Sequence, residues 1–370
     1  MNSRERILAV MEGRAADRIP VAPIFWNAEY AWKLTERPIW EFLHGAHGSG
    51  LETEMLEALD TRHDCDWVLS AHGTSGALVG KTYAREDAQR VYFSDDKSGE
   101  EYVFCKSGHW MVPVSSLKSA RGSHAGTNVA PPQNKTEADE WFARTFPPSE
   151  MKPDRTLRGR FPDRFLCANI GAPFAQFAYS LGFEPALLLL HDNPSLCSYL
   201  LERILEPLPR DCAQLAACGF DGAVMVDSWA SADIMSPQTY VDRVAPFHKM
   251  VSDELHSAGL KSIYWNTGNI LPMLDTIAQM GYDAVNPEER IKGVEIDIGE
   301  VRKGLGPDAC IIGNFDAYLL LSGDRDEIRR EVHRQISLAG PERFIMGTGS
   351  PVCDGTDPDV LDFWMDEVRG

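Results

Sequence analysis

Short apolar runs rich in β-branched and aromatic residues alternate along this chain with longer segments of helical spacing. Most of the runs are apolar throughout, which is typical of parallel strands that are covered on both faces. Eight such runs span residues 19–26, 64–71, 164–170, 222–227, 260–265, 283–286, 309–314 and 343–347. Eight strands that alternate with helices predict an α/β fold of the (β/α)8, or TIM-barrel, type. An open doubly wound sheet is the competing interpretation, but no G-x-G-x-x-G sequence follows the first run to support it.

Helix boundaries can be predicted from the residues between these runs. Several helical segments stop at a glycine, as in HSAG, AQMG and SLAG, which is a common way for a helix to end. Ser236 and Asn193 each precede a proline, so each is expected to cap the first turn of a helix.

One stretch interrupts the alternation. Lys97, Ser98 and Gly99 separate two runs rich in Tyr, Val and Phe, which is a β-hairpin signal. We interpret residues 73–160 as an insertion after the second strand, partly an antiparallel meander, that lies over the mouth of the barrel. Residues 1–370 then form a single barrel domain that carries this insertion.

Composition excludes some partners and compartments. The 370 residues contain 36 Lys and Arg against 55 Asp and Glu, a net charge of −19. Such acidity argues against a nucleic-acid or anionic-membrane surface, because phosphates would be repelled. No apolar run is long enough for a transmembrane helix, and the amino-terminal segment does not resemble a secretory signal. The eight cysteines form no C-x-x-C pair, which indicates buried thiols in a reducing, cytoplasmic protein.

Polar and aromatic residues gather where the predicted strands end, and barrel enzymes place their chemistry at these ends. In chain order these residues are Trp26, Asn27, Tyr30, His72, Asn169, Asp227, Trp229, Trp265, Asn266, Thr267, Asn286, Glu288, Glu289, Asn314, Asp316, Thr348 and Ser350.

Aromatic and amide side chains dominate this set, and no Lys or Arg ends a strand. Such a pocket suits a flat aromatic or apolar small molecule that is oriented by hydrogen bonds. Core packing is the alternative interpretation of the tryptophans, and an architectural turn is the alternative for Asn314 and Asp316. The predicted substrate-binding residues are Trp26, Asn27, Tyr30, Trp229, Trp265, Asn266 and Asn314.

Three side chains are candidates for acid–base catalysis. Asp227 ends an apolar strand, where a carboxylate is costly to bury without a partner; it is interpreted as a catalytic group or as a loop anchor. His72 has an ordinary pKa near neutrality and is interpreted as an acid or base or as a structural loop residue. Glu288 is expected to point into the mouth, and Glu289 to be a surface ion-pair partner.

Several segments together resemble the uroporphyrinogen decarboxylase superfamily, which includes decarboxylases and corrinoid-dependent methyltransferases. The resemblance rests on RERILAVMEGRAADRIPVAP near the amino terminus, on the central segment from GFDGAVMVDSW to YWNTGNILPMLD, and on IIGNFDAYLLLSGDRDEIRREV and FIMGTGSPVCDGTDP. It covers most of the chain outside parts of 73–160. It implies a TIM barrel, and members of this superfamily often pair, so it also implies a homodimer.

The functional motifs of the superfamily are changed in this sequence. Zinc-binding members have a His and two Cys at positions that correspond to Trp265, Thr267 and Ser350, and an indole and hydroxyls do not replace such ligands. We therefore expect no metal; a rebuilt site that uses Cys353 is the alternative. Porphyrinogen decarboxylases have an Arg-rich segment after the first strand and an Asp after the second. The corresponding residues here are PIFWNAEYAWKL, without Arg, and Ala71 or His72.

Three hypotheses follow from these differences. The first is a zinc-independent methyltransferase, or demethylase, that acts on a small methoxylated aromatic substrate, with Asp227, His72 or Glu288 as the acid. Because the barrel accounts for the chain, the corrinoid acceptor would be carried by a partner protein. The second is a carboxy-lyase that acts on a small aromatic or heterocyclic acid. The third is a non-catalytic small-molecule binder.

Overall fold

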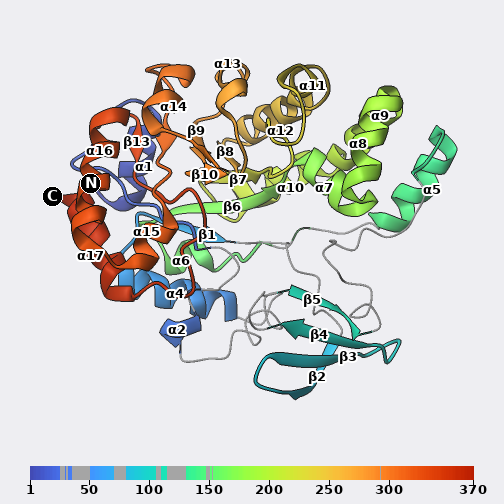
Figure 1. The fold of residues 1–370 in the computed structure, drawn as a ribbon, viewed down its shortest axis with the longest axis horizontal. Helices are drawn as coiled ribbons and strands as arrows, with labels where there is room; N and C mark the ends of the chain where they lie inside the picture. The colour runs from blue at the N-terminus through green and yellow to red at the C-terminus, as the bar shows by residue number, and fades with distance from the viewer. Residues whose placement is uncertain are drawn as a thin grey trace.

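A computed structural model describes residues 1–25, 30, 32–35, 51–70, 81–105, 110–114, 131–146, 151, 153–291 and 293–370. Its central feature is a parallel sheet that curls, with helices on its outside (Figure 1). The strands, in their spatial order within the described residues, are β1 (Trp67–Ser70), β6 (Phe165–Gly171), β7 (Gly222–Val226), β8 (Lys261–Asn266), β9 (Ala284–Pro287), β12 (Ile311–Ile312) and β13 (Phe344–Ile345). These seven strands confirm seven of the eight expected runs.

The segment of the first expected strand lies between the two edges of this sheet. Val21 forms a parallel bridge with Met346, whose backbone N–H donates to Pro20 O at 2.9 Å, and Asp66 N–H donates to Val21 O at 2.9 Å. A continuous strand is not formed there, because Pro20 and Pro23 have no N–H to give to a ladder. Hydrogen bonds on both sides support closure of the sheet into an eight-membered barrel, which stays a prediction.

Helices follow the strands, and the predicted caps at Ser236 and Asn193 are confirmed, because each side chain accepts from the backbone N–H three residues later. The helices are α1 (Ser3–Met11), α2 (Trp32–Thr35), α4 (Leu51–His63), α5 (Lys135–Thr145), α6 (Leu157–Arg160), α7 (Pro173–Leu181), α8 (Phe183–Asp192), α9 (Pro194–Leu205), α10 (Leu208–Ala217), α11 (Pro237–Arg243), α12 (Ala245–Ser257), η3 (Leu271–Met273), α13 (Leu274–Ile277), α14 (Ile298–Leu305), α15 (Ala317–Ser322), α16 (Arg325–Ala339) and α17 (Pro358–Arg369). No helix in the described part of the chain is long and apolar enough to cross a membrane.

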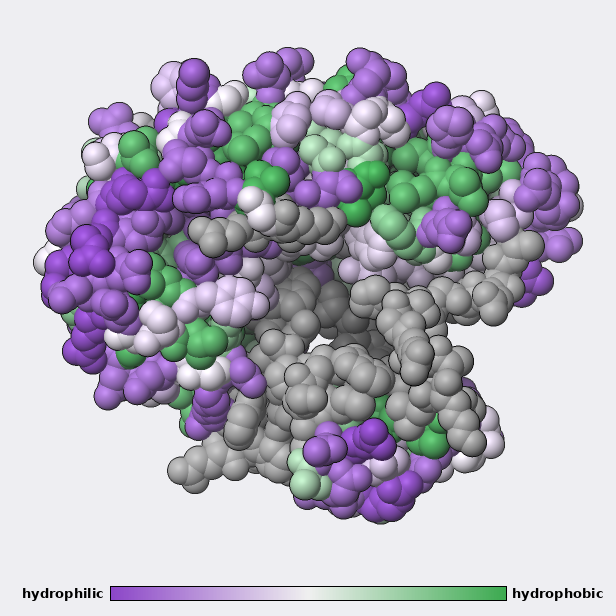
Figure 2. All heavy atoms as spheres, in the orientation of Figure 1, coloured by the Kyte–Doolittle hydropathy of each residue, from purple (hydrophilic) through white to green (hydrophobic). Residues whose placement is uncertain are grey.

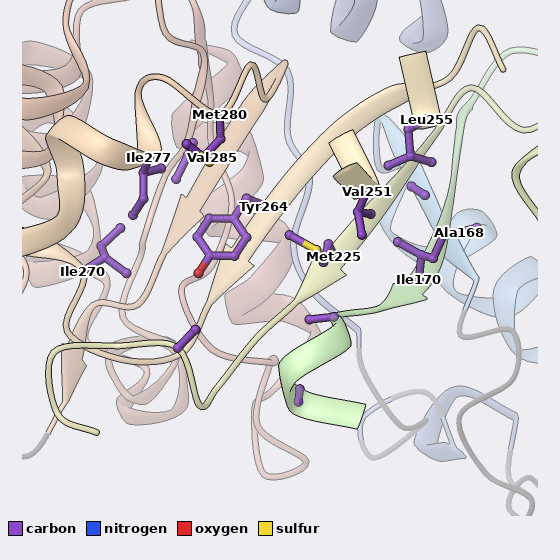
Figure 3. Close-up of a cluster of buried hydrophobic side chains, with 14 of the residues drawn as sticks. Ala168, Ile170, Met225, Val251, Leu255, Tyr264, Ile270, Ile277, Met280 and Val285 are labelled. Carbon is purple, nitrogen blue, oxygen red and sulfur yellow. The ribbon is translucent and has the colours of Figure 1, made fainter. Parts of the chain in front are cut away.

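Alternate residues of each strand enter two different cores. Along β8, the side chains of Ile263 and Trp265 belong to an inner cluster within the curl of the sheet, which also includes Trp67, Phe165, Val224 and Ile312. Tyr264 points the other way, into the layer between sheet and helices, where Met225 lies near Val251 of α12 and Val285 lies near Ile277 and Met280 (Figure 3). The alternation of side chains therefore assigns each residue to one of the two cores, although both faces of these strands are apolar.

The expected antiparallel meander is present within the insertion. A four-stranded sheet, β2 (Lys81–Glu86), β3 (Arg90–Asp95), β4 (Glu101–Cys105) and β5 (Trp110–Pro113), lies apart from the parallel sheet (Figure 1). In the space-filling view its side chains form a mostly hydrophilic surface at the bottom (Figure 2). The hairpin at 97–99 is confirmed: Gly99 has a φ of +70° and donates its N–H to Asp95 O at 2.8 Å. The expected place of the insertion over the mouth stays a prediction.

Candidate active site at the ends of β8, β9 and β13

Two adjacent glutamates follow β9 and are both buried. Glu288 is 5% exposed and Glu289 is 9% exposed. The interpretation of Glu289 as a surface ion-pair partner is therefore wrong, and no described Lys or Arg forms an ion pair with it. The short antiparallel strands β10 (Arg290–Ile291) and β11 (Val294–Glu295) follow, and Ile296 N–H donates to Glu289 O at 2.9 Å at the base of this pair. This hydrogen bond fixes the backbone of Glu289, and both acidic residues are shielded from solvent.

Glu288 accepts two hydrogen bonds at this site. Its Oε1 accepts from the Ser350 hydroxyl at 2.6 Å and from the backbone N–H of Glu289 at 3.3 Å. Asn314 positions the same residue, because its Nδ2 donates to Glu288 O at 3.0 Å and to Ile296 O at 2.6 Å. Asn314 thus ties the loop after β12 to the loop after β9, and its predicted role in substrate binding stays a prediction.

Glu289 lies in different surroundings, although it is the next residue. Its Oε2 is buried and has no hydrogen-bond partner. The backbone of Gly349 lies so close that a Cβ at that position would be 2.1 Å from this oxygen. Burial, together with the adjacent Glu288 carboxylate, raises the pKa of Glu289 to about 9. At neutral pH Glu289 is therefore a buried carboxylic acid.

Trp265 fixes the loop that lies over Glu289. Its ring is buried at the top of the inner cluster, and its indole N–H donates to Gly349 O at 2.9 Å. The contact joins the end of β8 to the loop after β13. Trp265 therefore lies beside the carboxyl pair, but its polar atom is bonded to the protein.

Asp227 is a fully buried loop anchor. Its Oδ1 accepts from the backbone N–H groups of Trp229 at 2.8 Å and Ala230 at 3.0 Å. Its Oδ2 lies 3.0 Å from Nε2 of His248 on α12, which is also fully buried. Tyr240 completes the group, with its hydroxyl 3.3 Å from His248 Nδ1. These contacts correspond to the loop-anchoring interpretation, and a catalytic role for Asp227 stays a prediction.

Trp229 lies in the loop after β7, and Asn266 contacts that loop from the end of β8. Asn266 donates to Ala230 O at 3.0 Å and accepts from Gly268 N–H at 2.8 Å, so it joins the loops after β7 and β8. Trp229 packs at the surface against the exposed ring of Tyr179, with centroids 5.2 Å apart, and against Phe183 at 4.4 Å. Trp229 is thus part of an aromatic group on α7, α8 and this loop, and its place in a pocket wall stays a prediction.

The remaining predicted site residues come from the first two strand ends. Tyr30 is buried, and its hydroxyl lies 2.9 Å from Nε2 of His63 on α4, whose Nδ1 lies 2.7 Å from Asp362 on α17. Its polar end is therefore bonded to helices, and its part in substrate binding stays a prediction. Trp26, Asn27 and His72 lie outside the described residues.

Comparison with known proteins decides the family. The uroporphyrinogen decarboxylase family matches residues 155–370, more than half of the chain, including β6 to β13 and the carboxyl pair. The chain belongs to the uroporphyrinogen decarboxylase family. The structure also matches a solved methyltransferase from Methanosarcina mazei, with a TM-score of 0.67 and 15% identity over 100% of this chain and 98% of that one. This second likeness concerns the fold alone.

Curated relatives carry the name uroporphyrinogen decarboxylase. The relative from Myxococcus xanthus is 29% identical over 205 residues, 54% of this chain and 56% of that protein. The relative from Nocardia farcinica is 32% identical over 209 residues, 53% of this chain and 56% of that protein. The matched part of the chain thus spans little more than half the length of these relatives.

Two of the three residues at positions where zinc-binding members carry ligands form hydrogen bonds within this protein instead. Trp265 donates a hydrogen bond and has no lone pair for a metal, and the Ser350 hydroxyl donates to Glu288. These donors do not fit a zinc ion. Cys353 is half-buried, with its Sγ 3.9 Å from Ala317 O, and no group of three metal-binding side chains occurs among the described residues.

The sequence analysis missed three residues that this geometry brings out. Glu289 was assigned to the surface, although the paired carboxyls at a strand end were themselves a signal of a shifted pKa. Ser350 was expected at a strand end and at the position of a replaced ligand, but not as a hydrogen-bond donor to Glu288. His248 was overlooked, although its spacing to Val251 and Leu255 places it on the apolar face of α12.

Proposed function

We propose that the chain is an enzyme in which Glu289 acts as a general acid on a small aromatic substrate, and that its reaction is zinc-independent demethylation of a methoxylated aromatic. The observation that carries this proposal is the buried carboxyl group of Glu289 after β9, whose pKa is raised to about 9, so that it keeps its proton at neutral pH. A carboxyl whose pKa lies above neutrality can keep its proton until the transition state takes it.

Demethylation requires this proton on the aryl oxygen, because that oxygen is the leaving group. When the bond between the methyl carbon and the aryl oxygen breaks, both bonding electrons stay on oxygen, and a bare phenolate is a poor leaving group. Glu289 gives its proton to that oxygen, so the products are a phenol and the Glu289 carboxylate, which regains a proton from water. A corrinoid on a partner protein would supply the nucleophile that accepts the methyl group.

The other predicted residues take supporting parts in this proposal. Trp229 offers an aromatic wall, and Trp26 and Asn27 stay predicted contacts of the ring and its oxygen. Asp227 and Asn266 hold the loop that carries Trp229. His72 stays a second candidate for the proton donor. Since the described strand ends offer no cation, the proposal favours a neutral methoxylated ring over a polycarboxylate.

The test measures turnover of methoxylated aromatic compounds with a reduced corrinoid as methyl acceptor. The readout is the phenol, measured by chromatography. Glu289→Gln keeps the shape of the side chain but has no acidic proton, so kcat should fall by about 100-fold or more while KM changes little. Glu342→Gln, at an exposed position, is the matched control and should keep the wild-type rate. An unchanged kcat in Glu289→Gln would refute the proposal.

Decarboxylation is the second candidate, because the curated relatives are named as decarboxylases. Loss of carbon dioxide from an aromatic acid leaves a carbanion, and Glu289 could protonate that carbon in the same way. The corresponding aromatic carboxylic acids are therefore tested in a second arm of the assay, with carbon dioxide as the readout. Ligand binding without turnover in either arm would favour the third hypothesis, a non-catalytic binder.

A further inference from the structure

One buried amide of the parallel sheet has an oxygen without a hydrogen-bond partner. Asn169 of β6 is 6% exposed, and its Oδ1 is buried and unpaired in the described structure. We infer that Asn169 is a substrate-binding residue whose Oδ1 accepts a hydrogen bond from a hydroxyl or N–H group on the aromatic substrate. This inference rests on the proposed function for the identity of the ring, and it adds a second polar group that the substrate carries.

The place of Asn169 follows from the alternation of side chains along β6. Ala168 and Ile170 belong to the layer between sheet and helices (Figure 3). Cys167 belongs to the inner cluster, so Asn169 also lies on the inner face of the sheet. The next inner position is Gly171, which ends the strand and has no side chain. Asn169 is therefore the last side chain of β6 inside the curl, near the carboxyl end of the strand, where barrel enzymes bind their substrates.

The neighbours of this amide on the inner face are apolar. Val224 of β7 lies directly opposite Asn169 in the strand pair, Cys167 precedes it on the same face, and both belong to the inner cluster. An unpaired amide oxygen in such a place destabilises the folded protein, because it has lost its hydrogen bonds to water. A leucine side chain has a similar shape and no polar atom. The amide is thus unfavourable for the fold alone, whereas a substrate that donates a hydrogen bond would satisfy it.

Asn286 of β9 shows how a buried amide is held when its role is structural. It follows Ala284 of the inner cluster by two residues, so it lies on the inner face, and it is also buried. Its Nδ2 lies 3.2–3.3 Å from three backbone carbonyl oxygens, those of Ile312, Gly313 and Thr348. These contacts join the end of β9 to the ends of β12 and β13. In the described structure no such contact to the protein is made by Asn169 Oδ1.

The two amides give opposite predictions when each is replaced by leucine in the whole protein. Asn169→Leu removes an unpaired buried oxygen, so the melting temperature of the ligand-free protein should stay the same or rise. Asn286→Leu removes a donor from carbonyls that stay buried, so it should lower the melting temperature by several degrees. If Asn169→Leu lowers the melting temperature as much as Asn286→Leu does, the amide of Asn169 has a structural role and the inference is overturned.

Binding is measured by titration calorimetry with pairs of ring compounds that differ in one hydrogen-bond donor. The compound para-methoxyphenol has a hydroxyl where para-dimethoxybenzene has a second methoxy group, and the ortho isomers give the same comparison for adjacent ring positions. We expect the wild type to bind the phenol of one pair about 10-fold more tightly than its dimethoxy analogue. Asn169→Leu should bind both members of that pair equally. A wild type that prefers neither phenol, or a preference that persists in Asn169→Leu, would overturn the inference.

These experiments separate the inference from the proposed function, because binding is measured without turnover. If Glu289→Gln keeps full turnover while Asn169→Leu loses the preference for the phenol, the general-acid proposal fails and the binding role of Asn169 stands. If Glu289→Gln abolishes turnover while Asn169→Leu keeps the preference, the acid stands and Asn169 does not bind the substrate.

Discussion

Trp265 at the end of β8 donates its indole N–H to the carbonyl of Gly349 at 2.9 Å, across the top of the inner cluster. The bond satisfies a carbonyl of the loop that covers Glu289. One buried side chain thus connects the apolar interior to the position of the acid. Packing and acid chemistry are therefore coupled at this residue.

Trp265→Phe removes that bond and leaves the carbonyl of Gly349 without its partner. Trp364→Phe is the matched control, because Trp364 is also buried but its indole nitrogen has no hydrogen-bond partner in the described structure. Both variants lose ring volume, but only the first loses a hydrogen bond. Urea unfolding should show Trp265→Phe to be less stable than Trp364→Phe by about 1 kcal/mol. Equal losses would mean that the bond contributes nothing.

Gly349→Ala tests the close approach of the loop to the acid. The added methyl group would lie 2.1 Å from Glu289 Oε2 and 2.7 Å from the Glu289 backbone nitrogen, so the loop or the carboxyl has to move. We expect a loss of about 1–3 kcal/mol in the free energy of unfolding. Gly159→Ala is the control, since nothing lies within 4 Å of its new methyl group, and its stability should not fall. A stable Gly349→Ala protein with an unchanged Glu289 pKa would contradict this geometry.

Most of the fold could be predicted because its signals are local. Apolar runs, capping residues such as Ser236 and the turn at Gly99 each act over a few residues, and the structure has them where they were expected. The first strand is the exception. Its composition is that of a strand, but Pro20 and Pro23 limit its ladder to a bridge at Val21. A hydrophobic pattern predicts which residues are buried, but it does not show whether each residue has a backbone N–H for the strand ladder.

The sequence could predict where the site lies, but not the hydrogen-bond partners of its residues. The strand ends do bring Trp265, Glu288 and Ser350 together, as the barrel hypothesis required. The sequence could not say which polar atoms are already bonded to the protein. Asp227 and Asn266 turn out to hold backbone groups, whereas Glu289 is left with a buried, unpaired oxygen. Those outcomes depend on contacts between residues far apart in the chain, which no local pattern contains.

His248→Ala tests the buried pair beneath the loop of Trp229. Asp227 would keep its two backbone donors but would lose its side-chain partner in a fully buried position. Removing one member of such a pair costs about 3 kcal/mol, because the other polar group stays buried. His191→Ala, on the surface beside Asp192, should change stability by less than about 0.5 kcal/mol. Similar values for the two variants in urea unfolding would rule out a structural role for the buried pair.

The raised pKa of Glu289 predicts how stability depends on pH. The folded protein binds this proton more tightly than the unfolded chain does, because the pKa rises from 4.5 to about 9 on folding. The stabilisation is therefore complete below about pH 4.5 and is lost as the pH rises through about 9. Between these values Glu289 should lower the free energy of unfolding by up to about 1.4 kcal/mol per pH unit. Glu289→Gln cannot ionise, so its unfolding free energy should fall less steeply with pH than that of the wild type when both are measured in urea. Parallel pH profiles would show that Glu289 is already ionised in the folded protein.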